Sequence, residues 1–195
     1  MAGKVFRIDI SKPVEETAET VSSVLKAGGT VVYPSDTVYG ILADASCLQA
    51  VKSVAEMKGY SQIRPFIVLV KSVTRALELT SKKDAEQTMK KHWPGSVTLI
   101  LPASDAVHSW LVSDTDTVAL RIPSDRLSTK ILSCSGLDLV TTSANKKGAP
   151  FPLSTGRVHP GILDSVSIIL DSGPLPDRKP SRIIDVTNET PVDLR

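Results

Sequence analysis

Apolar and polar positions recur with two different periods along this chain. Between residues 13 and 26, apolar side chains return every three to four positions and would form one stripe of a helix. The "AGG" that follows suits a left-handed helix end. Runs such as "TVVYP" and "PFIVLV" are short, almost continuously apolar and bounded by turn residues, which is typical of buried strands.

The same criteria predict further elements along the whole sequence. Helices are predicted at 46–57, 84–93 and 126–134, and strands at 5–10, 30–34, 65–70, 96–102, 117–123, 137–143, 166–173 and 181–187. Helices and strands alternate, with additional strands late in the chain, so we expect an α/β fold with an open sheet of mixed parallel and antiparallel direction and flanking helices. No linker-like break occurs, which predicts one domain over residues 1–195.

Composition and charge narrow the class of protein. The 195 residues are 41% hydrophobic and 23% charged, as in ordinary soluble proteins, and the net charge of +2 gives no general nucleic-acid signal. The longest apolar runs are of strand length and no signal-peptide pattern is present, so we expect a cytoplasmic protein that does not enter a membrane. Cys47 and Cys134 match no metal or redox spacing, which predicts two reduced thiols.

Several common catalytic motifs do not occur in the sequence. It contains no G-x-x-x-x-G-K-S/T phosphate loop, no G-x-G-x-x-G, no H-E-x-x-H and no G-x-S-x-G. We therefore expect neither a metal site nor a protein nucleophile. An enzyme built on this chain would act by positioning and electrostatics.

Hydroxyl and cationic residues gather instead where predicted strands end. The segments are "PSDTVYG", "KGYSQIRP", "LRIPSD", "TTSANKKG" and "KPSRIID". Asp, Ser and Asn are common turn formers and helix caps, but ligands of open α/β sheets also bind at strand ends. Several such segments on one sheet favour a binding site.

Taken in chain order, these motifs resemble those of one family. "PSDTVYG" is similar to P-T-D-T-x-Y-G, "WPGSVTLIL" to W-P-G-x-x-T-L-I-L, "VALRIP" to V-x-x-R-x-P, "TTSAN" to the S-A-N element and "KPSRIID" to S-T-I-I/V-D. The match runs from about residue 28 to 187, and the chain is identified as a member of the YrdC-like threonylcarbamoyl-AMP synthases. The last matching strand lies close to Arg195, so the additional C-terminal domain of longer relatives is expected to be absent.

The resemblance implies a twisted sheet around a concave basic cavity, and a nucleotidyltransferase reaction. Threonine and bicarbonate would give N-carboxythreonine, whose carboxylate attacks the α-phosphorus of Mg²⁺-bound ATP and releases pyrophosphate. The product, threonylcarbamoyl-AMP, serves the threonylcarbamoyladenosine modification of transfer RNA. Implied partners are therefore ATP, L-threonine, bicarbonate, the downstream threonylcarbamoyl-transfer proteins, and tRNA or double-stranded RNA.

The resemblance also implies roles for particular residues. Contacts with ATP are implied for Lys58, Arg64, Ser143 and Asn145, the first two also as catalytic cations, and contacts with threonine or bicarbonate for Ser35, Thr37, Tyr39, Arg121 and Ser181. Each has an ordinary structural interpretation as well. Arg121 could form a surface salt bridge, Tyr39 could simply pack, and Asp36 is either a turn former or a ligand contact.

The segment "KGYSQIRPF" departs from the family pattern K-G-R-P-x-x-x-P-L/F. Lys58 matches, but Tyr60 stands where the family has arginine, and Arg64 follows four residues later. Four residues of chain span at most about 13 Å, so a loop can return Arg64 to the same point. We predict that Arg64 substitutes for the missing arginine.

Two alternatives lead to other functions. A YrdC-like paralogue without synthase activity would act as an RNA- or nucleotide-binding module. Basic residues around the late loops favour it: Lys146, Lys147, Arg157, Arg178, Lys179 and Arg182. Such charges are also ordinary on a solvated face. A carbamoyl-transfer module of hydrogenase maturation would be accompanied by acylphosphatase and zinc-finger segments, which this sequence does not contain.

Overall fold

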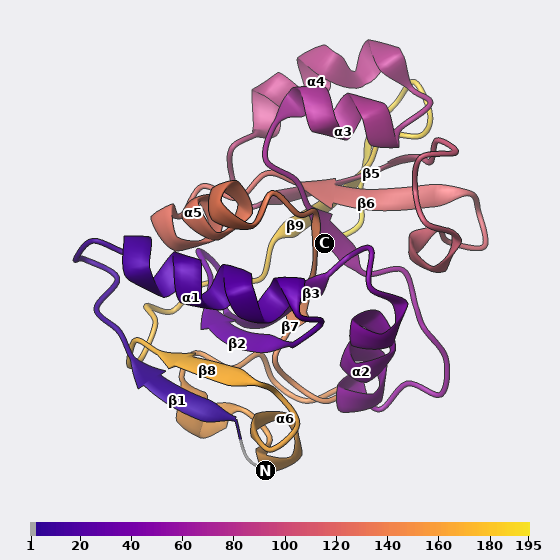
Figure 1. The fold of residues 1–195 in the computed structure, drawn as a ribbon. Helices are drawn as coiled ribbons and strands as arrows, with labels where there is room; N and C mark the ends of the chain where they lie inside the picture. Colours follow the sequence, from indigo (N-terminus) through magenta and orange to yellow (C-terminus); the bar gives the residue numbers. More distant parts are fainter. Residues whose placement is uncertain (1–2) are drawn as a thin grey trace.

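A single ten-stranded sheet runs through the protein, seen in a computed structural model that describes residues 3–195 (Figure 1). The strands are β1 (Lys4–Arg7), β2 (Val31–Pro34), β3 (Tyr39–Asp44), β4 (Ile67–Leu69), β5 (Val97–Pro102), β6 (Thr117–Arg121), β7 (Leu139–Ser143), β8 (Ile168–Asp171), β9 (Arg182–Asp185) and β10 (Val192–Asp193). Their order is β1-β8-β2-β3-β7-β4-β6-β5-β9-β10. Parallel pairs (β1/β8, β2/β8, β4/β6, β5/β9) occur beside antiparallel ones, which confirms the predicted mixed sheet.

Helices cover both faces of this sheet. They are α1 (Glu15–Lys26), α2 (Leu48–Lys58), α3 (Val73–Leu79), α4 (Glu86–His92), α5 (Arg126–Ser135) and α6 (Pro160–Leu163), with short 3-10 turns η1 (Lys83–Ala85), η2 (Ser109–Leu111) and η3 (Thr155–Arg157). Helices α1 and α5 pack against each other and share one apolar cluster with the sheet (Figure 1). Helices α2, α3, α4 and α6 contribute to a second, larger cluster.

Strand alternation separates these two clusters. Within β4, Ile67 and Leu69 contact the α1/α5 cluster, whereas Val68 between them belongs to the other. Successive side chains of a strand point to opposite faces, so each neighbouring strand repeats this division. Apolar residues therefore line both faces, and central strands such as β3 are buried throughout.

Local sequence explains how the helices start and stop. Glutamates occupy the first turn of α1 and a lysine its last, which complements the helix dipole. The Asp125 carboxylate caps α5 by accepting a hydrogen bond from the Ser128 amide, at 2.8 Å. Gly59 and Gly136 end α2 and α5 with φ of 79° and 69°, a left-handed conformation that favours glycine.

The structure corrects several predicted bounds. The strand predicted at 5–10 ends at Arg7, because its partner β8 ends at the paired Asp171. The helix predicted at 84–93 begins as the 3-10 turn η1 and continues as α4. Strands β3 and β10 and helices α3 and α6 were not predicted. Strand β10 and helices α3 and α6 are too short to show a clear hydrophobic period. Strand β3 is buried on both faces and contains a glycine, so its apolar and polar residues do not alternate.

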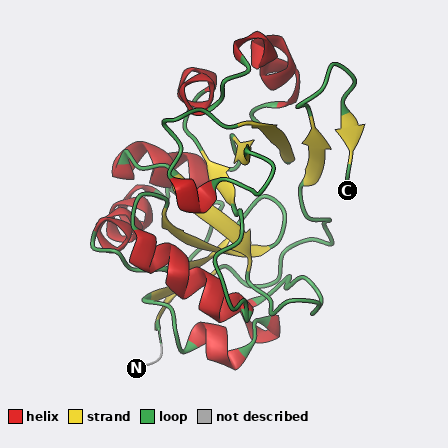
Figure 2. Ribbon diagram, turned by 90° about the vertical axis from the view of Figure 1, so that its right-hand side faces the viewer, coloured by secondary structure: helices red, strands yellow, loops and turns green. Residues whose placement is uncertain are grey.

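The two ends of the sheet are exposed edges. Strand β1 forms one edge and the two-residue β10 the other, beside the C-terminal end of the described chain (Figure 2). Four of the five motif segments lie at the ends of the inner strands β2, β3, β4, β6 and β7, whereas "KPSRIID" lies at β9, next to the edge strand β10.

Candidate active site

A cavity of about 460 Å³ lies on the face of the sheet that also carries α1 and α5. The lining residues identify this face. Ile67, Thr141 and Arg121 lie on the paired strands β4, β7 and β6, and their pairing and the alternation of side chains put them on the same face. The lining includes three arginines, Arg64, Arg121 and Arg195, and no carboxylate side chain from the described residues. The charged side chains in this lining are therefore arginines alone.

Lys58, Ser143 and Asn145 form a connected polar cluster at this site. Lys58 is the last residue of α2 and is only 4% exposed. Its Nζ donates to the Ser143 carbonyl oxygen at 2.7 Å and to Asn145 Oδ1 at 2.8 Å, and lies 3.4 Å from Ser143 Oγ. Ser143 Oγ in turn donates to Asn145 Oδ1 at 2.6 Å. The family elements that are about 85 residues apart in sequence are thus joined directly.

The electrostatic state of Lys58 follows from its burial. All three acceptors of its ammonium group are neutral, and desolvation lowers the pKa of Lys58 to about 8. Ser143 lines the cavity, whereas Lys58 and Asn145 lie behind it. The lysine therefore holds a positive charge beneath the cavity wall without a carboxylate to neutralise it.

Arg64 lies close to the position of the missing family arginine. Its guanidinium carbon is 5.5 Å from the centre of the Tyr60 ring, and both residues line the cavity. Tyr60 in turn packs at 6.3 Å against Phe66. The loop between them thus returns Arg64 to the neighbourhood of residue 60, which supports the predicted substitution. The role of Arg64 in ATP binding stays a prediction.

Arg121 forms a buried ion pair with Asp36, a contact that the sequence alone did not predict. Its Nη2 lies 2.5 and 2.6 Å from the two oxygens of Asp36, and its Nε donates to the Gly95 carbonyl at 2.9 Å. The two side chains are 6% and 10% exposed. Asp36 therefore holds Arg121 in place. The salt bridge of Arg121 is buried and does not lie on the surface, and Asp36 is more than a turn former.

The hydroxyl residues of the first motif are organised mainly by each other. Ser35 Oγ donates to the Val38 carbonyl at 2.7 Å, accepts from the amides of Thr37 and Val38, and lies 2.9 Å from Thr37 Oγ1. Both Ser35 and Thr37 line the cavity. Ser181 lines it from the opposite side and bonds Thr98 Oγ1 at 3.0 Å.

Tyr39 is placed differently from the other predicted residues. It is fully buried, and its hydroxyl bonds Ser172 Oγ at 3.0 Å and the Gly173 carbonyl at 2.8 Å. It is absent from the cavity lining, so its aromatic ring packs in the core and its hydroxyl holds the loop after β8. A contact between Tyr39 and substrate remains a prediction.

Arg195 is a site residue that sequence reasoning missed. Its Nε donates to the Ser181 carbonyl at 3.1 Å, its guanidinium lies 6.0 Å from the Phe151 ring, and it lines the cavity. Desolvation lowers the pKa of Arg195. No motif marks an isolated arginine after the last predicted strand, so only the position of β10 beside β9 reveals it.

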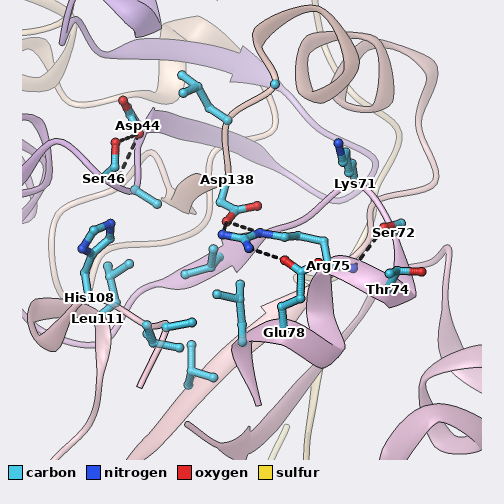
Figure 3. Close-up of a pocket in the computed structure, with 18 residues that line it drawn as sticks. Asp44, Ser46, Lys71, Ser72, Thr74, Arg75, Glu78, His108, Leu111 and Asp138 are labelled. Atoms are coloured by element: carbon cyan, nitrogen blue, oxygen red, sulfur yellow. Dashed lines mark hydrogen bonds and ion pairs between the residues drawn. The ribbon is translucent and has the colours of Figure 1, made fainter. Parts of the chain in front are cut away.

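A second cavity, of about 580 Å³, lies on the opposite face of the sheet (Figure 3). Val68 and Val118, from the other side of β4 and β6, form part of its floor. Figure 3 shows Arg75 between Asp138 and Glu78. Its Nε and Nη2 bond Asp138 Oδ2 at 2.9 and 2.8 Å, and Nη1 bonds Glu78. The charge of this arginine is therefore compensated by two carboxylates.

Two further features of the described chain bear on function. Across residues 3–195, no helix combines the length and the apolar character needed to span a bilayer. Among the same residues, no group of three or more His, Cys, Asp or Glu side chains is arranged so that it could bind a metal ion.

The fold and the site together define an α/β protein whose central strands carry a cationic, hydroxyl-rich cavity suited to anionic ligands. The Sua5/YciO/YrdC family model, described as "Telomere recombination", matches residues 23–195. The chain belongs to this family.

Individual relatives agree with that assignment. A threonylcarbamoyl-AMP synthase of Pyrococcus abyssi is 33% identical over 192 residues, which cover 96% of this chain and 56% of the relative. The solved structure of P. abyssi Sua5 complexed with L-threonine matches with a TM-score of 0.87 and 30% identity, covering all of this chain and 57% of the other. Escherichia coli YciO, at 23% identity and a TM-score of 0.88, covers 99% of this chain and 95% of its own length and shares the fold. The chain spans little more than half the length of the P. abyssi relative.

Proposed function

We propose that this protein is an L-threonylcarbamoyladenylate synthase, which makes threonylcarbamoyl-AMP and pyrophosphate from L-threonine, bicarbonate and ATP. The observation that carries the proposal is the joining of Lys58 to Ser143 and Asn145 at a cavity that three arginines line. Relatives at about one third identity carry the synthase name, and P. abyssi Sua5, at 30% identity, is solved with L-threonine.

The proposed chemistry needs no protein nucleophile. The threonine amine and bicarbonate give a carbamate and water, and a carbamate oxygen then attacks the α-phosphorus of Mg²⁺-bound ATP. The bond between the α-phosphorus and the bridging oxygen breaks, and pyrophosphate leaves with that electron pair. Catalysis then consists of holding the two reactants in line and neutralising the negative charge that shifts onto the leaving pyrophosphate.

The residues present can supply those functions. Lys58, Arg64 and Arg195 would neutralise the triphosphate, and Ser143 would donate or accept a hydrogen bond at the nucleotide. Nη1 of Arg121 has no partner among residues 3–195, so it would hold the threonine carboxylate. Ser35, Thr37 and Ser181 would offer hydroxyls to the amino acid or bicarbonate. The product would pass, in the cytoplasm, to proteins that transfer threonylcarbamoyl to tRNA.

Threonine-dependent pyrophosphate release tests the proposal. The purified protein is incubated with ATP, Mg²⁺, bicarbonate and L-threonine, and pyrophosphate is measured with threonine, without it, and with L-serine or L-valine in its place. Release that requires threonine supports the synthase. If pyrophosphate release is absent, or does not depend on the amino acid, the proposal is wrong, and retained RNA binding would then favour the nucleotide- or RNA-binding paralogue.

A further inference from the structure

Asp36 connects its own segment to two others, one that carries Arg121 and Ser124 and one that carries Arg178. Both of its carboxylate oxygens bind Nη2 of Arg121, and Oδ2 also accepts from Ser124 Oγ at 3.1 Å. Its carbonyl oxygen accepts from Nη1 of Arg178 at 3.0 Å. With the Arg121 Nε fixed on the Gly95 carbonyl, the guanidinium is held at two of its three nitrogens, and Nη1 is left for a ligand.

The same contact makes Arg121 electrically different from the other cations of the cavity. In the part of the chain that the structure describes, Asp36 is the one carboxylate within ion-pair distance of Arg121, and Arg64 and Arg195 have none. Lys58 binds only neutral acceptors. Arg121 is thus part of a buried, neutralised ion pair, whereas Arg64 and Arg195 line the same cavity without a carboxylate partner among the described residues. Arg178, which bonds the Asp36 carbonyl, is exposed and does not belong to the lining.

We infer that Asp36 is a positioning and specificity-determining residue that reserves the Arg121 end of the cavity for a single carboxylate and excludes phosphate groups from it. A phosphate bears more than one negative charge and is attracted to unpaired cations, whereas the Asp36 charge next to Arg121 repels it. A monocarboxylate needs only the directed Nη1 donor and neighbouring hydroxyls. This inference rests on the proposed function for the identity of that carboxylate, the threonine group.

Calorimetric titration of L-threonine, with and without inorganic phosphate, tests the inference. Asp36→Asn keeps the size and one acceptor oxygen but removes the charge. We expect it to bind threonine about tenfold or more weakly, because the charge-assisted bond that orients the Arg121 guanidinium becomes a neutral one and Nη1 is no longer held toward the threonine carboxylate. We also expect inorganic phosphate to compete with threonine in Asp36→Asn but not in the wild type, since Arg121 then becomes an unpaired cation. ATP affinity should stay within about twofold, because the contacts of Lys58 are unchanged.

Two further variants separate this role from a general loss of structure. Asp138→Asn removes the carboxylate partner of Arg75 in the second cavity (Figure 3), and is expected to leave threonine affinity and phosphate competition unchanged. Asp36→Glu restores the charge and should restore the exclusion of phosphate even where threonine affinity stays reduced. If Asp36 had only a structural role, its substitution would not change whether phosphate competes with threonine.

The outcomes distinguish this inference from the proposed function. Threonine affinity in Asp36→Asn equal to the wild type, or phosphate that competes equally in both, overturns the inference. If the wild type itself does not bind threonine, the proposed function fails, and titration of inorganic phosphate alone decides the inference. Asp36→Asn should then gain a phosphate site that the double variant with Arg121→Ala lacks, and the absence of that gain would refute the role of Asp36.

Discussion

At the scale of single residues, the burial of Lys58 determines how the site should respond to pH. The ammonium group is desolvated and its pKa is about 8, so the positive charge beneath the cavity wall is lost as the pH rises through that value. We expect kcat/KM for ATP to fall above about pH 8. Lys58→Arg, which stays protonated, should remove this inflection even if it lowers the rate.

Protein stability should change in the opposite direction over the same range. The pKa of Lys58 is lower in the folded chain than its ordinary 10.5, so between about pH 8 and 10.5 the unfolded chain binds more protons. The contribution of Lys58 to the free energy of unfolding therefore rises with pH in this window. Urea denaturation at pH 7.5 and 9, run beside the kinetics, checks that activity is not lost through unfolding, and a pH-independent kcat/KM would contradict the role of Lys58.

A second prediction at this scale concerns Arg64 and its neighbour Tyr60. Arg64→Ala should lower kcat/KM for ATP by about 10- to 100-fold, since a charge-assisted contact contributes about 1.5–3 kcal/mol. Placing the family arginine back, as Tyr60→Arg in the Arg64→Ala background, should recover most of that loss, because the Arg64 guanidinium lies over the Tyr60 ring. Arg7→Ala, in the edge strand β1, is the control for removing a surface arginine.

Unchanged ATP kinetics in Arg64→Ala would show that Arg64 does not replace the family arginine. A loss that Tyr60→Arg fails to recover would instead show that the two positions do not reach the same point. The steady-state KM and kcat of the single and double variants distinguish these results.

At the scale of elements, the end of α2 positions Lys58. Lys58 is followed directly by Gly59, whose φ of 79° turns the chain away into the "YSQIR" loop, and the Lys58 carbonyl accepts from the Lys147 amide at 3.2 Å. The helix end thus contacts both the end of β7 at Ser143 and the segment that follows it with Asn145 and Lys147. The backbone geometry at Gly59 is therefore coupled to the cluster of Lys58, Ser143 and Asn145.

A pair of matched glycine substitutions tests that coupling. Gly59→Ala and Gly136→Ala each place a side chain at positive φ with no atom within 4 Å of the new Cβ, so both should lower the free energy of unfolding by about 1 kcal/mol. Gly59→Ala alone should also raise the KM for ATP, because it shifts Lys58. Chemical denaturation and ATP kinetics measure the two effects. An equal KM change in both variants would mean that the effect is general destabilisation.

At the scale of the whole molecule, the sheet order assembles the cavity from distant parts of the chain. Arg195 follows β10 at one edge of the sheet, yet its Nε bonds the Ser181 carbonyl and its guanidinium lies near Phe151 on the same cavity as Arg64. Arg195 therefore adds a third arginine to the cavity that Arg64 and Arg121 also line.

This contribution predicts a salt-dependent loss in Arg195→Ala. Its side chain is accessible, so the substitution should change the free energy of unfolding by less than about 0.5 kcal/mol. It should raise the KM for ATP by about tenfold at low ionic strength, with a smaller difference at high salt, because screening weakens the lost attraction. ATP titrations at two salt concentrations measure this effect. A difference that does not depend on salt would indicate a packing role beside Phe151.

The sequence by itself determined the elements with a clear period and the chemistry available at their ends. The mixed sheet, the helices at α1 and α5, and the motifs that supply Lys58, Ser143, Asn145 and Arg121 are visible because periodicity and local turn signals are short-range properties. Strand β3 escaped prediction because burial on both faces removes the alternation.

Only the tertiary structure decided which side chains meet, and with what charge. Arg121 and Asp36 are 85 positions apart, and their ion pair depends on the order of the strands. The same order brings Arg195 to the cavity and turns the Tyr39 hydroxyl toward Ser172. Burial, which lowers the pKa of Lys58, is likewise a property of the packed molecule. A residue's partners and its solvent exposure depend on the contacts between elements, and local sequence does not encode them.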